Sequence, residues 1–115
     1  MTELTFVRFQ QFNANRQRHF RHDPWPAHLW ALAIAGEAGE LCNLLKKVVR
    51  GDFTLEAKRD EVLKEVADVI TYCDLLMTCL DARTSEELIK KFNEVSTRVG
   101  YPQVTERQIG VADEA

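Results

Sequence analysis

Two short acidic motifs, each set in a long apolar run, constrain the fold of this chain more than any other feature. Glu37-Ala38-Gly39-Glu40 lies within the run 30–45, and Glu65-Val66-Ala67-Asp68 opens the run 66–80. At about 100° per residue, two carboxylates three positions apart share one face of a helix. Each motif therefore predicts a helix that carries a pair of acids among apolar side chains.

The four acids are expected on buried faces and close to a cation. Steps of three or four residues from Glu37 and Glu65 meet mostly apolar side chains, namely Trp30, Ala33, Leu41, Leu44 and Val48 in the first run and Val62, Val69, Tyr72 and Leu76 in the second. Buried carboxylates destabilise a fold unless positive charge meets them. Salt bridges to arginines of the N-terminal helix are one solution. A divalent cation would neutralise all four acids at once.

The ligand chemistry of this centre favours magnesium. Only oxygen ligands are offered, which selects Mg²⁺, with Mn²⁺ as a substitute, over Zn²⁺ or Cu²⁺. The Glu-x-x-His signature of di-iron helical proteins is missing, because Glu40 and Asp68 occupy the relevant positions. Since Mg²⁺ usually meets its substrate through phosphate oxygens, the expected substrate is a polyphosphate.

The composition is that of a globular protein of one domain. The chain has 115 residues, 45% of them hydrophobic and 29% charged, with a formal net charge of −3. That charge argues against binding to nucleic acid or to an anionic membrane. The start lacks a signal-peptide layout, and Asp68 and Asp74 interrupt the longest apolar stretch, so a cytoplasmic protein is expected. Cys42, Cys73 and Cys79 lie in apolar helical patterns and are expected to be reduced and buried.

The pattern of apolar residues and breakers predicts an all-α fold, an antiparallel bundle of four main helices. The helices are expected at residues 3–20, from 26 or 27 to 50, at 55–80 and at 84–99. The prolines of the segment 23–26 separate the first two, and Gly51 suits the left-handed position after the second. Thr54 is the expected N-cap of the third helix, and Thr84 begins a capping-box pattern for the fourth. The short connection at 51–53 predicts that the second and third helices form a hairpin.

The stretch Leu32–Leu41 and the stretch Glu65–Tyr72, with 24 residues between Glu40 and Glu65, resemble the MazG-like all-α nucleoside triphosphate pyrophosphohydrolases. The signature of that family is E-E-x-x-E, a spacer, and E-x-x-D, and the resemblance covers roughly residues 5–102. It implies a helical catalytic domain at 1–102, a tail at 103–115 that is loose or packed on a partner subunit, and a dimer or dimer of dimers. It also implies Mg²⁺-dependent cleavage of a nucleoside triphosphate to a nucleoside monophosphate and inorganic diphosphate. The implied role is house-cleaning of the nucleotide pool. The implied metal ligands are Glu37, Glu40, Glu65 and Asp68.

Other positions are candidates for substrate contacts. Tyr72 matches a family tyrosine near the nucleotide, and His28 corresponds loosely to a polar position ahead of the motif. Trp25 either stacks on a base or covers the core. The candidates for contacts with phosphate are Lys47, Lys91, Asn93 and Arg98.

One position departs from the family signature. Its first glutamate is Gly36 here, so any role of that carboxylate is unfilled. Glu61, one turn before Glu65, is the hypothetical substitute as general base; the alternative is that it pairs with Lys58 or Lys64. Two other functions stay open: a related phosphohydrolase that prefers dUTP, dCTP or an alarmone-type nucleotide, and a non-catalytic helical oligomer that binds nucleotide or protein.

Overall fold

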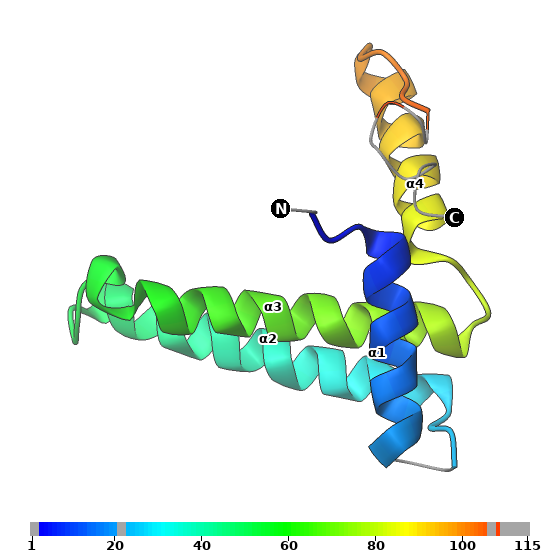
Figure 1. Cartoon of the computed structure of the whole chain (residues 1–115). Coiled ribbons are helices and arrows are strands. Elements are labelled where there is room, and N and C mark those ends of the chain that lie inside the picture. Colours follow the sequence, from blue (N-terminus) through cyan, green and yellow to red (C-terminus); the bar gives the residue numbers. More distant parts are fainter. Residues whose placement is uncertain (1–2, 21–22, 106–107, 109–115) are drawn as a thin grey trace. The chain divides into compact units, whose positions relative to one another are not determined.

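The computed structural model describes residues 3–20, 23–105 and 108, and in this part of the chain it contains four helices and no strand. They are α1 (Phe6–Phe20), α2 (Ala27–Arg50), α3 (Leu55–Cys79) and α4 (Thr84–Val99) (Figure 1). The all-helical prediction is confirmed. The chain divides into two compact units, residues 25–76 and residues 1–24 with 77–115. No helix in the described ranges is both long enough and apolar enough to cross a membrane.

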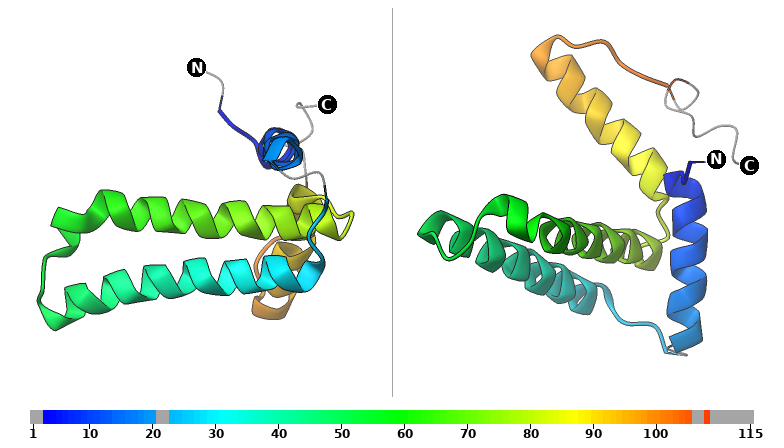
Figure 2. Two further views of the ribbon diagram at one scale, coloured as in Figure 1. Left: turned by 90° about the horizontal axis from the view of Figure 1, so that it is seen from below. Right: turned by 60° about the vertical axis from the view of Figure 1, so that its left-hand side comes forward.

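Residues 25–76 form a helical hairpin in which α2 and α3 run antiparallel, side by side (Figures 1 and 2). Gly51 follows α2 with a φ of 90°, a conformation that glycine adopts without steric cost. The N–H groups of Gly51 and Asp52 donate to the carbonyls of Val48 and Lys47, each at 3.0 Å. Thr54 caps α3 as predicted, because its Oγ1 accepts the N–H three residues later at 3.1 Å. Cys42 and Cys73 are exposed in the lone chain, so the prediction of buried thiols is wrong for both.

The other unit is tied together by the side chain of Gln10, on α1. Its Nε2 donates to Thr78 Oγ1 at 3.0 Å and to the Ala82 carbonyl at 2.9 Å, and its Oε1 accepts from the Thr84 N–H at 3.0 Å. The N-cap of α4 is Arg83, which makes no side-chain capping bond. The predicted capping box stays a prediction: α4 begins at Thr84, and the acceptor for the Thr84 N–H comes from Gln10 on another helix.

The end of α4 is also tied down by an amide side chain. Gly100 follows the helix with a φ of 77°. The Asn93 Nδ2 donates to the Val104 carbonyl at 2.9 Å, and the Val104 N–H donates to Asn93 Oδ1 at 2.8 Å. Residues 103–105 of the predicted tail thus fold back along α4, while 106–107 and 109–115 lie outside the described residues.

Candidate metal centre

Three carboxylates converge on the seam between α2 and α3. Glu37 comes from α2, and Glu65 and Asp68 come from α3; one oxygen of each lies within 4.8 Å of the other two. Oxygens that ligate one Mg²⁺ at about 2.1 Å are roughly 3 to 4.2 Å apart. Small side-chain rotations would therefore bring all three carboxylates onto a single ion.

The negative charges of these acids repel one another. The pKa of Glu37 is raised from its ordinary value of 4.5, first by burial and then by the negative charges of Glu40, Asp68 and Glu65. Burial, followed by the charges of Glu40 and Asp68, likewise raises the pKa of Glu65. Glu40 therefore belongs to the same field of negative charge, although it is not one of the three converging residues. A cation at this point would favour the charged form of every member.

No positive group of the described residues neutralises this cluster. The ion pairs in this part of the chain involve other acids, so the predicted alternative of arginine salt bridges has no example among them. Glu65 Oε2 is buried and has no hydrogen-bond partner. Buried oxygens are normally satisfied by a protein group, water or an ion. An orphaned carboxylate oxygen beside two other carboxylates fits a cation site.

The acids are less buried than the sequence predicted. Glu37 and Glu65 are half-buried, whereas Glu40 and Asp68 are exposed. The prediction of buried faces is wrong for the second acid of each pair, because three residues along a helix turn that side chain toward the edge of the seam. Next to this edge lies Gly36, at which an added Cβ would meet nothing within 4 Å. The acidic side of the hairpin is therefore open to a ligand.

Glu61 lies near the centre but is engaged elsewhere. Lys58 Nζ contacts its Oε1 at 3.2 Å, which is one of the two pairings expected as the alternative to a catalytic role. Its negative charge nevertheless contributes to the raised pKa of Glu65. The role of Glu61 as a general base stays a prediction.

Three aromatic rings line the same hairpin. The half-buried Trp25 ring lies against buried Trp30, with ring centroids 4.6 Å apart, and Trp30 lies 6.1 Å from Tyr72. Trp25 was predicted to stack on the base or to cover the core, and Tyr72 to lie near the nucleotide, whereas Trp30 was assigned only to the apolar face of its helix. Its position seven residues before Glu37, on the same face, was the available signal that it links the aromatic rings to the acids.

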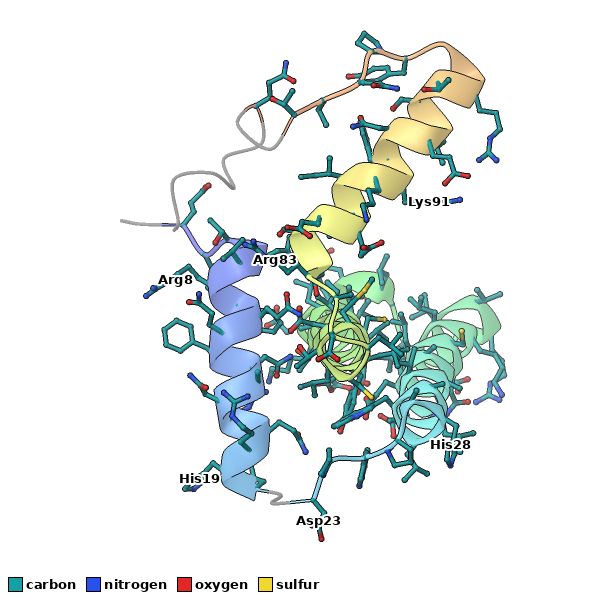
Figure 3. All side chains as sticks on the ribbon, turned by 90° about the vertical axis from the view of Figure 1, so that its right-hand side faces the viewer. Arg8, His19, Asp23, His28, Arg83 and Lys91 are labelled. Carbon is teal, nitrogen blue, oxygen red and sulfur yellow. The ribbon has the colours of Figure 1, made fainter. Side chains whose placement is uncertain are left out.

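The remaining predicted contacts fall into two groups. Lys47 is half-buried on α2, seven residues after Glu40 and on the same side of the helix, and His28 is exposed at the start of α2 (Figure 3). Lys91, Asn93 and Arg98 belong to α4 in the other unit. Lys91 Nζ pairs with Glu94 at 3.3 Å, and the Asn93 amide is bonded to the backbone of Val104. Only the first group shares a compact unit with the acids.

Comparison with known proteins gives one partial similarity. No family model matches the chain, and no solved structure matches it. The chain is 34% identical over 70 residues to the Gene 37 protein of Mycobacterium phage L5, and the aligned part is 58% of this chain and 60% of the phage protein. The chain thus spans less than two thirds of that relative, whose name states no activity.

Proposed function

We propose that this protein is a magnesium-dependent nucleoside triphosphate pyrophosphohydrolase of the MazG-like kind. Water attacks the α-phosphorus and breaks its bond to the oxygen that bridges the α and β phosphates. The products are a nucleoside monophosphate and inorganic diphosphate. The observation that carries the proposal is the convergence of Glu37, Glu65 and Asp68 around the orphaned oxygen of Glu65. The motif resemblance adds the order and spacing of the acids.

The residues of the hairpin have distinct roles in this proposal. Glu37, Glu65 and Asp68 would hold the ion, with Glu40 completing the ligand set. When bound, Mg²⁺ supplies neutralisation of phosphate charge and activation of the attacking water. Lys47, on the same side of α2 as Glu40, attracts the phosphate tail. The exposed side of the acidic cluster leaves room for a triphosphate to approach.

The aromatic rings provide the surface for the base. A nucleobase offers a flat π-face, and stacking on aromatic side chains tolerates different bases. Trp25 is half-buried, and the ring of buried Trp30 lies against it, with ring centroids 4.6 Å apart. Preference for one base, including that of dUTP or dCTP, would come from polar groups around this ring.

Product analysis with a panel of substrates tests the proposal. The purified chain is incubated with each NTP and dNTP and an alarmone nucleotide, with Mg²⁺ or with EDTA, and the products are separated by ion-exchange chromatography. Equal amounts of nucleoside monophosphate and inorganic diphosphate, formed only with Mg²⁺, support the proposed pyrophosphohydrolase activity. Orthophosphate as the sole inorganic product contradicts it. Tight nucleotide binding with no product would favour the non-catalytic oligomer.

A further inference from the structure

The negative net charge of the chain conceals a basic segment around α1. Residues 4–22 contain four arginines and two histidines but no acidic residue, although the whole chain has a net charge of −3. Within α1 the basic side chains are Arg8, Arg16, Arg18 and His19, and all four are exposed. The expectation that the chain does not bind nucleic acid followed from the net charge alone. At contact distance, however, a local cluster of one sign attracts a partner of the opposite sign.

One exposed face of α1 combines basic side chains with an aromatic ring. At about 100° per residue, Arg8, Phe12 and His19 lie within about 40° of one another, and Arg16 lies about 40° beyond Phe12. Figure 3 shows Arg8 and His19 on the same side of the helix. The Arg8 guanidinium lies 5.4 Å from the centre of the Phe12 ring, and Phe12 is 59% exposed. We call these four residues the basic-aromatic face, which is about 16 Å long at 1.5 Å per residue.

An open pocket borders the basic-aromatic face. It has a volume of about 590 Å³ and lies between α1 and residues 78–83, at the end of α3 and in the connection to α4. Its polar lining includes Gln11, Asn15 and Arg18 of α1 and Arg83 of the connection. Gln11 and Asn15 are exposed, and around the helix they lie between the face and the rest of the pocket. The face and the pocket therefore form one continuous surface within a single compact unit.

The polar groups of the pocket suit a nucleotide. Arg18 donates one hydrogen bond to Asn15 Oδ1, and Arg83 pairs with an acid of α4. Both guanidinium groups keep further N–H donors, since each has five, and such donors bind phosphate oxygens. The amide of Gln11 offers a donor and an acceptor to the polar edge of a base. Asp81 also lines the pocket, and its oxygens can accept from the amino group of a base.

The pattern favours a single-stranded nucleic acid over other polyanions. A helix that lies on a membrane needs a wide apolar side. The other exposed phenylalanines of α1, Phe6 and Phe20, lie about 160° and 120° from Arg8 around the helix, so they do not extend the surface of Phe12 into such a side. An acidic protein would engage the arginines without using the ring. A single strand offers both phosphates and unstacked bases, which stack on aromatic side chains.

From these observations we infer that the basic-aromatic face and the adjacent pocket bind a short stretch of single-stranded nucleic acid. Arg8 and Arg16 bind phosphates, and a base stacks on Phe12. The pocket receives a neighbouring nucleotide, whose phosphate is bound by Arg18 and Arg83. The inference goes beyond the proposed function, because it uses none of the residues of the metal centre.

Fluorescence anisotropy with a labelled thymidine oligonucleotide of about 15 nucleotides tests the inference. EDTA is present throughout, so that the metal centre is not engaged. If four arginines contact phosphates, affinity should fall about 50-fold between roughly 50 and 200 mM salt. Arg18→Ala should weaken binding about fivefold and flatten this salt dependence, since one phosphate contact is lost. Wild-type protein that does not bind the oligonucleotide at the lower salt concentration would overturn the inference.

Phe12→Ala separates stacking from charge. It should weaken binding of the single strand about tenfold while leaving the salt dependence unchanged, because a stacked base is lost and no phosphate contact is. The affinity for a duplex of the same length should not change. Full affinity of Phe12→Ala for the single strand would reject the inference, as would tighter binding to vesicles of phosphatidylglycerol than to the oligonucleotide.

The matched control for the arginine variant is Arg59→Ala. Arg59 is also exposed but belongs to α3 in the other compact unit. This variant should bind the oligonucleotide like the wild type, and far-UV circular dichroism should show equal helix content in all the proteins. Equal weakening in Arg59→Ala and Arg18→Ala would mean that overall charge, and not this surface, determines binding, which contradicts the inference.

Discussion

Two groups of polar side chains in this protein differ in how their hydrogen-bonding atoms are paired. Around Gln10, both polar atoms of the amide are bonded to Thr78, Ala82 and Thr84. In the α2–α3 hairpin, acids converge without a cationic partner among the described residues, and Glu65 keeps a buried oxygen that has no hydrogen bond. The Gln10 centre is complete within the chain and therefore structural. The acidic centre leaves an oxygen without a partner among the described residues, as the proposed cation site requires.

The largest effect that this contrast predicts is on activity. Asp68→Asn keeps the shape of the side chain but removes a negative charge that would hold the ion in the proposed function, so kcat/KM should fall by at least about 100-fold, since a catalytic metal supplies several kcal/mol. The melting temperature in EDTA should stay the same or rise, because one member of a mutually repelling group is lost. Steady-state kinetics and thermal denaturation give both values.

Asp60→Asn is the matched control for this variant. Asp60 is exposed on the same helix and is not part of the carboxylate cluster, so both activity and melting temperature should stay at wild-type values. Full activity of Asp68→Asn would place the metal centre elsewhere and remove the basis of the contrast.

The second effect is on stability at the structural centre. Gln10→Ala removes three hydrogen bonds and leaves the Thr84 N–H and the Ala82 carbonyl without this partner. At about 1 kcal/mol each, the free energy of unfolding should fall by about 3 kcal/mol, or roughly 10 °C in melting temperature. Gln11→Ala changes the neighbouring, exposed residue and should have little effect. Equal losses in both variants would mean that helix propensity, not the cross-links of Gln10, is responsible.

The contrast also explains what the sequence could and could not predict. Helix positions followed from apolar periodicity and from breakers such as Gly51, because these act over a few residues. The pairing of Glu37 with Glu65 and Asp68 followed from a short turn that forces a hairpin. The bonds of Gln10 join residues more than 60 positions apart, and no local pattern distinguishes Gln10 from Gln11. Exposure of Glu40 and Asp68 was missed because motif spacing gives a shared face but not the depth of each residue on it.

The third effect concerns metal and pH together. The pKa values of Glu37 and Glu65 are raised above 4.5, so the folded state binds more protons than the unfolded state between 4.5 and the raised values. Their favourable contribution to the free energy of unfolding is fully present below this pH range and is lost as the pH rises through it. In EDTA, these two groups should therefore raise the melting temperature as the pH is lowered toward 5. Glu65→Gln should weaken this dependence.

In the proposed function, magnesium should act in the reverse direction, because it would bind the deprotonated acids. At a free concentration ten times Kd it should add about 1.4 kcal/mol to the free energy of unfolding at pH 8, and less at pH 5. Calorimetry at the two pH values, with and without the ion, measures the difference. Stabilisation that is larger at pH 5, or that persists in Glu65→Gln, would contradict binding at the carboxylates.

The smallest effect tests whether Gly36 leaves space for substrate or has no role in substrate binding. Gly36 lies one turn before Glu40, and an added Cβ would meet nothing within 4 Å, so Gly36→Ala should stabilise α2 by about 0.5–1 kcal/mol. Gly39→Ala should stabilise it equally, since its Cβ also meets nothing, but Gly39 lies on the back of the helix. If substrate approaches the backbone at Gly36, only Gly36→Ala will lower kcat/KM. Equal slowing in both variants would point to helix rigidity, and unchanged rates in both would show that substrate does not use the open space at Gly36.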